Sequence, residues 1–313
     1  MSSKGRAARD GFPDEGRLIQ LVYYLYRGGS ALAQALPEGL AYAMANLLGT
    51  VQMYLSPRKR AIVGRNLARV TGELPGSPRL EKLVGDAYRS YARYWLETFR
   101  LARASPGFFL ERFTCHHIER LDEARARGGA VIVVGHLGNW DAAGAWVAAS
   151  GRPAITIAEV LRPRRLFEFF CEHRARLGMT IYPALPGVTT KLVEDVKQGR
   201  LVAILGDRDL SGRGIEVDFF GARSTLPVGP ASVALRAGVP LLVVGVYGVR
   251  RPDGTRGWEA EVGEAIELPS ERGPPALGEL TQKIASEFER YVARRPEEWH
   301  VFQPVWLEDR RSS

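Results

Sequence analysis

The chain has 313 residues, the length of two average domains or one large α/β domain. Hydrophobic residues make up 45%, charged residues 25% and aromatic residues 9%, which excludes intrinsic disorder and fibrous repeats. A mean hydropathy of −0.14 argues against several membrane spans. The formal net charge is +8, and the only two cysteines, Cys115 and Cys171, form no CxxC pair. We therefore predict neither a disulfide framework nor a zinc site.

The positive charge is concentrated near the N-terminus. Residues 1–70 contain ten basic and four acidic residues, a net charge of +6 out of the total of +8. The same region holds two apolar stretches, the tyrosine-rich residues 18–26 and residues 40–55. Such stretches beside basic residues favour an anionic membrane surface, although they also suit a helical subdomain that packs on the core, and the two interpretations are compatible. The first stretch is too short to span a bilayer, Asn46 and Gln52 interrupt the second, and no signal peptide is apparent.

Helical patterns are predicted over residues 16–56 and 80–104, with a Gly/Pro/Ser loop around 72–78. From about residue 111, short apolar runs bounded by Gly or Pro alternate with helical patterns. The predicted strands are 130–134, 154–158, 179–182, 201–205, 216–220, 239–246 and 258–262, and the predicted helices are 117–127, 140–150, 162–177, 188–198, 229–237 and 276–294. This alternation predicts an α/β fold, a mixed, mostly parallel sheet flanked by helices, with an N-terminal helical extension.

A histidine stands where such a sheet binds ligands, at the carboxyl end of a strand. His136 follows the most strand-like run, 130–134, by two residues. Asn139 is predicted to cap the next helix, which puts Asp141 in its first turn, where the helix dipole favours a carboxylate. We expect His136 and Asp141 to come within hydrogen-bond reach, so that the aspartate orients the imidazole as a general base. The alternative is a histidine and an aspartate that only cap the helix.

A second polar segment, residues 206–221, follows the predicted strand 201–205. Its arginines suit phosphate groups and its acids suit sugar hydroxyls, the alternative being a solvated loop with internal ion pairs. No G-x-S-x-G, H-E-x-x-H, Walker A or dinucleotide-binding glycine pattern is present, and Cys115 is interpreted as a small buried hydrophobe. A base without a protein nucleophile indicates direct transfer to a hydroxyl that the substrate supplies.

Four segments, in this order, resemble one enzyme family. Residues 134–141 are similar to the H-x4-[DE] motif of the lysophospholipid acyltransferase superfamily, in the form found in bacterial lipid A late acyltransferases and phosphatidylinositol mannoside acyltransferases. Residues 60–67 resemble the basic Asn-Leu segment of that branch, residues 207–221 its Asp…Phe-Phe-Gly loop, and residues 229–231 the helix start that follows. The Phe-Pro-Glu-Gly-Thr-Arg motif of the glycerol-phosphate acyltransferases is missing, which argues against their branch. Aspartate at 141, the Asp-Arg-Asp-Leu-Ser run from Asp207 and the ending at residues 298–304 favour the mannoside enzymes.

The resemblance implies a glycerolphosphate acyltransferase-like fold and transfer of a fatty acyl chain from a thioester, acyl-CoA or acyl-carrier protein, to a glycolipid hydroxyl. His136 is then the general base and Asp141 its partner. Glu159 and Arg174 fall where the mannoside branch has further site residues. The complete set of predicted substrate-binding residues is Asn139, Glu159, Arg174, Asp207, Arg208, Asp209 and Glu216. Neither a metal nor a cofactor is expected, and acyl-CoA is a co-substrate.

We therefore expect an acyltransferase that acts on a mannose hydroxyl of a phosphatidylinositol mannoside, peripheral to the cytoplasmic face of the plasma (inner) membrane. Residues 1–110 are expected to form a helical, membrane-associating region, and residues 111–313 the catalytic region of one compact unit. The expected partners are an anionic membrane surface, the acyl donor and the glycolipid, but no nucleic acid. The alternatives are a lipid A late acyltransferase using acyl-carrier protein, a non-catalytic basic membrane- or nucleic-acid-binding protein, and a thioesterase.

Overall fold

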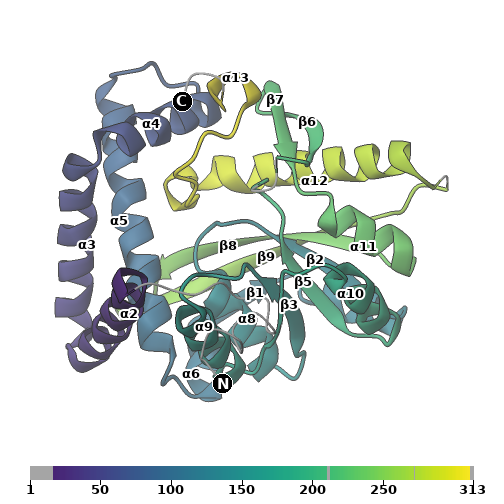
Figure 1. Cartoon of the computed structure of the whole chain (residues 1–313), viewed down its shortest axis with the longest axis horizontal. Coiled ribbons are helices and arrows are strands. Elements are labelled where there is room, and N and C mark those ends of the chain that lie inside the picture. The colour runs from purple at the N-terminus through teal and green to yellow at the C-terminus, as the bar shows by residue number, and fades with distance from the viewer. Residues whose placement is uncertain (1–16, 210–211, 271, 311–313) are drawn as a thin grey trace, which may run out of the picture.

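The computed structural model describes residues 17–209, 212–270 and 272–310. The described N-terminal part is helical (Figure 1), and its helices are α2 (Arg17–Ala35), α3 (Glu38–Leu55), α4 (Pro57–Thr71), α5 (Pro78–Leu101) and α6 (Pro106–Arg112). The described residues of the range 16–56 are helical, as predicted, and form the two helices α2 and α3, because the chain breaks at Pro37. Proline has no backbone N–H to donate, and its ring disfavours helical backbone at the preceding residue.

The centre of the fold is a seven-stranded sheet in the order β1-β9-β8-β2-β5-β3-β4. Every neighbouring pair is parallel except β8 and β9. The strands are β1 (Phe113–His116), β2 (Ala130–Val134), β3 (Ala154–Ala158), β4 (Thr180–Pro183), β5 (Leu201–Leu205), β8 (Leu241–Arg250) and β9 (Arg256–Ile266). The predicted fold class, a mixed and mostly parallel sheet flanked by helices with an N-terminal helical extension, is confirmed.

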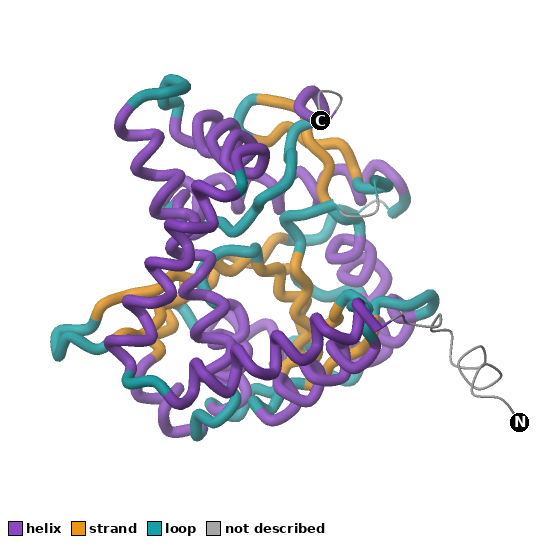
Figure 2. Tube along the Cα trace, turned by 60° about the vertical axis from the view of Figure 1, so that its left-hand side comes forward, coloured by secondary structure: helices purple, strands orange, loops and turns teal. Residues whose placement is uncertain are grey.

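Helices cover both faces of the sheet (Figures 1 and 2). They are α7 (Glu119–Ala126), α8 (Trp140–Ala149), α9 (Arg164–Arg176), α10 (Val188–Lys197), α11 (Gly229–Ala237) and α12 (Pro274–Arg294). Successive side chains of a strand point to opposite faces, so Val131 and Val133 pack in one core cluster with α10, α11 and α12. Ala130 and Ile132 pack in a second cluster with residues of α7 and α8.

The segment after β5 differs from the prediction. It forms a separate antiparallel hairpin of β6 (Ile215–Phe219) and β7 (Ala222–Leu226), of which only the first strand was predicted. The two turn residues, Phe220 and Gly221, have φ values of 47° and 71°. Positive φ at both central residues is the geometry of a tight type I′ hairpin turn.

The C-terminal segment, with a short 3-10 helix η1 (Pro296–Glu298) and helix α13 (Leu307–Arg310), returns to the N-terminal helices. Asn66 of α4 is buried, and its side-chain amide donates to the backbone oxygens of Val301 at 3.2 Å and Gln303 at 3.0 Å. These bonds hold the N-terminal helices against the segment that runs beside the sheet edge. None of the helices in the described ranges is long and apolar enough to cross a bilayer.

Candidate active site

His136 forms a hydrogen-bonded pair with Asp207. Strands β2 and β5 are parallel neighbours in which Val134 lies opposite Leu205, and each of the two residues stands two positions beyond its strand. The Nδ1 atom of His136 lies 2.7 Å from Oδ1 of Asp207, and the His136 backbone N–H donates to Oδ2 at 2.9 Å. Because an ionised carboxylate only accepts hydrogen bonds, Nδ1 carries the proton of the neutral ring and Nε2 is free to accept one.

Asp207 is suited to this role by its surroundings. It is almost completely buried, and the indole N–H of Trp299 donates to its Oδ2 at 2.9 Å. Burial alone would raise the pKa of Asp207, but the His136 ring and the hydrogen bonds from His136 and Trp299 hold it below its ordinary value. A carboxylate that stays ionised in this position stabilises a positive charge on the imidazole.

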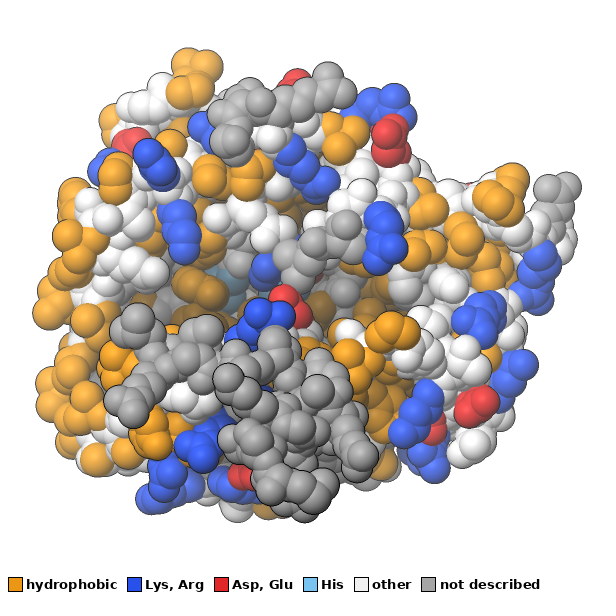
Figure 3. All heavy atoms as spheres, viewed as in Figure 1, with side chains coloured by type: hydrophobic (Ala, Val, Ile, Leu, Met, Phe, Trp, Pro, Cys, Tyr) orange, Lys and Arg blue, Asp and Glu red, His pale blue; other side chains and the backbone are white. Residues whose placement is uncertain are grey.

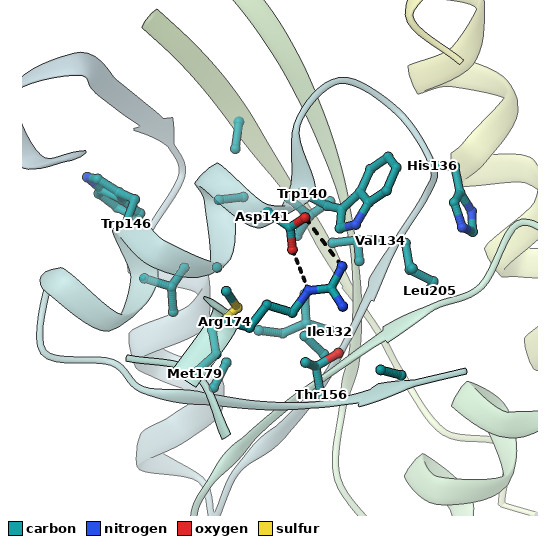
Figure 4. Close-up of a pocket in the computed structure, with 18 of the residues that line it drawn as sticks. Ile132, Val134, His136, Trp140, Asp141, Trp146, Thr156, Arg174, Met179 and Leu205 are labelled. Atoms are coloured by element: carbon teal, nitrogen blue, oxygen red, sulfur yellow. Dashed lines mark hydrogen bonds and ion pairs between the residues drawn. The ribbon is translucent and has the colours of Figure 1, made fainter. Parts of the chain in front are cut away.

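The predicted hydrogen bond between His136 and Asp141 is therefore wrong. Asp141 instead pairs with Arg174, with 2.6 Å between Arg174 Nε and Asp141 Oδ1, and it accepts from the Tyr94 hydroxyl at 3.1 Å. The ring of Trp140 lies between Asp141 and His136 (Figure 4) and packs edge-on against the His136 ring, with 5.1 Å between centroids. Burial alone would raise the pKa of Asp141, but the charge and hydrogen bonds of Arg174 hold it below its ordinary value.

Asn139 begins α8, as predicted. Its side-chain Oδ1 accepts from the backbone N–H of Ala142 at 3.0 Å, the geometry of a helix N-cap. Its side-chain amide donates to Glu97 at 2.8 Å. The loop that carries His136 is thus fixed at the helix start and tied to α5.

A pocket of about 290 Å³ opens beside His136, between α8 and the face of the sheet. Figure 4 shows His136 and Trp146 on opposite sides of it. Its walls are mainly apolar and include side chains of β1, β2, β5, β8, β9 and α8. The predicted residues that line it are His136, Asp141, Glu159, Arg174 and Arg208. Such a pocket accepts a hydrocarbon chain with one reactive end near His136.

Of the predicted substrate-binding residues, Asn139 and Asp207 hold the His136 loop but do not line this pocket, and Asp209 and Glu216 make their contacts away from it. Asp209 accepts hydrogen bonds from the backbone N–H groups of Gly212 at 3.0 Å and Gly214 at 2.9 Å, within its own loop. Glu216 is exposed and pairs with Arg223 across the β6–β7 hairpin. The ion pair of Glu216 matches the alternative of an ion-paired loop, whereas Asp209 is buried and held by hydrogen bonds. Asp207 contacts His136 and Arg208 lines the pocket.

The sequence interpretation missed the residues that surround His136 from other segments. Trp299 holds Asp207, and the backbone N–H of His300 donates to the His136 carbonyl oxygen at 2.7 Å. His300 is buried beside the site, and burial and neighbouring positive charge lower its pKa to about 3, so the ring is neutral. Trp299 and His300 belong to the C-terminal segment 298–304, for which the sequence indicated only a resemblance to the mannoside enzymes. Among the described residues, no three His, Cys, Asp or Glu side chains come together as metal ligands.

Comparison with known proteins shows the class to which this site belongs. Residues 14–308 match the family of bacterial lipid A biosynthesis acyltransferases, and the chain belongs to that family. It is therefore an acyltransferase, and the predicted resemblance is confirmed.

Two relatives with the same name align over most of the chain. A phosphatidylinositol mannoside acyltransferase of Mycobacterium tuberculosis (strain ATCC 25618 / H37Rv) is 34% identical over 296 residues, covering 91% of this chain and 89% of that protein. A protein of the same name from Mycolicibacterium smegmatis (strain ATCC 700084 / mc(2)155) is 34% identical over 292 residues, covering 91% of each. The crystal structure of the 1-acyl-sn-glycerophosphate acyltransferase PlsC from Thermotoga maritima aligns with a TM-score of 0.36 and 14% identity, covering 79% of this chain and 97% of that chain.

Proposed function

We propose that the protein transfers a fatty acyl chain from acyl-CoA to a mannose hydroxyl of a phosphatidylinositol mannoside. The observation that carries this proposal is the His136–Asp207 pair at the edge of an apolar pocket. The relatives named phosphatidylinositol mannoside acyltransferase, which align over 91% of this chain, support the choice of acceptor.

In the proposed mechanism His136 acts as the general base. Its Nε2 takes the proton of the acceptor hydroxyl while the hydroxyl oxygen attacks the thioester carbonyl carbon. Asp207 stabilises the imidazolium ion that forms. When the tetrahedral intermediate collapses, the carbon–sulfur bond breaks and the imidazolium returns the proton to the leaving thiolate. The products are the ester and free CoA, and no acyl-enzyme is formed.

The remaining lining residues receive distinct roles. The apolar wall between α8 and the sheet holds the acyl chain, and burying each methylene there contributes about 0.8 kcal/mol. Glu159 is suited to accept hydrogen bonds from sugar hydroxyls. Arg208, whose side chain donates to Gln303 at 3.1 Å, is suited to an acyl-donor or lipid phosphate. The buried Arg174–Asp141 pair shapes the pocket wall without touching His136.

We further propose that residues 1–110 bring the enzyme to an anionic membrane, at the cytoplasmic face of the plasma (inner) membrane. Hydrophobic side chains gather on the side of the molecule where α3 lies (Figures 1 and 3). The large exposed ones on α2 and α3 are Leu21, Val22, Tyr24, Leu25, Leu32, Leu40, Leu47, Leu48, Val51, Tyr54 and Leu55. Exposed Arg58 and Lys59 follow at the start of α4, and this combination favours binding at the surface of an anionic bilayer.

The proposal is tested with purified protein and radiolabelled palmitoyl-CoA or palmitoyl-acyl-carrier protein. Each donor is offered with a phosphatidylinositol mannoside or a Kdo-bearing lipid A precursor, with His136→Ala alongside. We expect label on the mannoside from acyl-CoA, and its loss in His136→Ala. Label only on the lipid A precursor would support a lipid A late acyltransferase instead. Free fatty acid released at full rate without an acceptor would identify a thioesterase, and no thioester consumption would indicate a non-catalytic membrane-binding protein.

A further inference from the structure

A second cavity, of about 270 Å³, lies behind the loop that carries His136. It is bounded by α5, the end of β8, the start of β9 and the segment 295–300, and Gly138 and Asn139 of the His136 loop also line it. Tyr94 and His300 line both this cavity and the apolar pocket beside His136, which we call the acyl pocket. These two residues therefore form the wall between the cavities. The second cavity has mostly polar and charged walls and is a separate place from the acyl pocket.

Four arginines line this cavity: Arg93, Arg250, Arg256 and Arg295, the last of which pairs with Glu298. Arg250 and Arg256 are opposite each other in the β8–β9 ladder, where like charges destabilise a sheet. Burial and the positive charge of Arg256 both lower the pKa of Arg93. Within the described part of the chain, Arg93, Arg250 and Arg256 form no ion pair, since no carboxylate oxygen lies within 4.0 Å of their guanidinium groups.

Arg93 and Arg256 contact neutral groups in the described structure. Arg93 donates to the side-chain oxygen of Asn46 at 2.9 Å, and the Arg256 guanidinium lies 4.3 Å from the centre of the Tyr42 ring. The charges of Glu97 and Glu298 offset part of the repulsion at Arg93. The guanidinium groups of Arg93, Arg250 and Arg256 match the oxygens of a phosphate group.

Carboxylates also face the cavity. Glu97 accepts from the Tyr42 hydroxyl at 2.9 Å, from Asn139 at 2.8 Å and from the Trp258 indole at 2.9 Å, all neutral donors. Glu298 pairs with Arg295 at 3.1 Å, and burial raises its pKa. Glu297 lines the cavity as well. Acceptors beside arginines suit a ligand that carries hydroxyl groups in addition to phosphate, since each hydroxyl has a hydrogen to donate.

From this arrangement we infer that the cavity behind the His136 loop is a binding site for a phosphorylated polyol. The phosphate lies among Arg93, Arg250 and Arg256, and hydroxyl groups face Glu97 and Glu297. This site is separate from the acyl-transfer chemistry and does not depend on the acceptor proposed above. The ligand is either a soluble polyol phosphate or the headgroup of an inositol phospholipid, which carry the same chemical groups.

The test measures ligand binding rather than activity. Full-length protein is titrated with myo-inositol 1-phosphate and, separately, with short-chain phosphatidylinositol, and inorganic phosphate at matched ionic strength is the reference. Binding is followed by calorimetry and by the shift in Tm. The variants are Arg93→Gln and Arg250→Gln, and Arg79→Gln is the control because its side chain is 78% exposed and it does not line the cavity.

We expect one or both polyol ligands to bind more tightly than inorganic phosphate, and each cavity variant to weaken that binding about tenfold or more. The control should bind as the wild type does. Arg250→Gln removes like-charge repulsion, so its Tm without ligand should not fall. Arg93→Gln also loses the hydrogen bond to Asn46, so its binding is measured well below its own Tm, which separates lost binding from misfolding. Binding of phosphatidylinositol alone would identify the ligand as a lipid headgroup. Binding of myo-inositol 1-phosphate would identify it as a free metabolite. No binding, equal binding of inorganic phosphate, or binding unchanged by both cavity variants would overturn the inference.

Discussion

The imidazole Nδ1 of His136 lies 2.7 Å from Oδ1 of Asp207, a residue from a different strand end and a different motif. The contact follows from the pairing of β2 with β5, which places the two strand exits side by side. Asp207 itself is held by the His136 backbone N–H and by Trp299. Asp207 therefore orients the base, and Asp141 forms the buried ion pair with Arg174.

The Asp141–Arg174 pair should contribute mainly to stability. Asp141→Ala leaves a buried guanidinium without its partner, so we expect the free energy of unfolding to fall by about 3–5 kcal/mol in urea denaturation. The control is Glu172→Ala, which removes an exposed ion pair with Arg176 on α9, the helix that carries Arg174. This change should lower the free energy of unfolding by no more than about 0.5 kcal/mol. Equal losses in the two variants would show that the buried pair has no special part in the fold.

Stability should rise with pH between about pH 4.5 and pH 6.5 because of His300. Its pKa is lowered to about 3 in the folded protein, so in this range the unfolded chain binds a proton that the folded chain does not. The contribution of one such histidine is at most about 1.4 kcal/mol per pH unit. Buried His173, whose pKa is also lowered, adds a change of the same sign.

The measurement is the free energy of unfolding against pH for the wild type and His300→Gln. Glutamine is able to keep the hydrogen bond to Ser90 but does not titrate. We expect a shallower slope in the variant over pH 4.5–6.5. An unchanged slope would mean that His300 is not buried in its neutral form.

Membrane binding should depend on the exposed leucines of α3. Leu47 and Leu48 are 64% and 61% exposed, and replacing both with glutamate puts two charges into the proposed contact with lipid. We expect Leu47→Glu/Leu48→Glu to lose most co-sedimentation with vesicles that contain anionic lipid, with little change in Tm. Leu74→Glu alters a leucine at least as exposed, outside α2 and α3, and should bind as the wild type does. Similar losses in both proteins would contradict a contact through α3.

The acyl pocket should favour long chains, and filling it should remove that preference. Ala143 of α8 lines the pocket, and Ala143→Phe adds a ring to the wall. We expect kcat/KM for a palmitoyl donor to fall at least about tenfold, and much less for a butyryl donor, because each excluded methylene forfeits about 0.8 kcal/mol. Equal losses with both donors would place the acyl chain elsewhere.

The sequence predicted the elements of the sheet better than the contacts between them. The apolar runs mark β2, β5 and β8, and the Asn139 cap marks the start of α8, because these depend on local patterns. The partner of His136 was not predicted, because the order of strands in a sheet is set by packing between distant segments. Asp207 stands two residues beyond β5 as His136 does beyond β2, and this shared position was the available signal.

Other parts of the site depend on segments even further apart. Trp299 reaches Asp207 across 92 residues of chain, and only the fold brings them together. The break at Pro37 has a local signal, proline inside a helical pattern, and it divides the helical region predicted over residues 16–56 into two helices. The cavity lined by Arg93, Arg250 and Arg256 combines α5 with the β8–β9 ladder, so no single stretch of sequence indicates it.

The most direct test of the account is single-turnover acyl transfer by Asp207→Asn, compared with Asp141→Asn and the wild type. Asparagine at 207 keeps the size of the side chain but removes the negative charge and permits the wrong imidazole tautomer. We expect Asp207→Asn to fold, to bind donor normally and to lose about 10³–10⁴-fold in rate. For the folded fraction of Asp141→Asn, we expect a much smaller loss of rate. A wild-type rate in Asp207→Asn, with the large loss in folded Asp141→Asn instead, would contradict the assignment of Asp207 as the partner of His136.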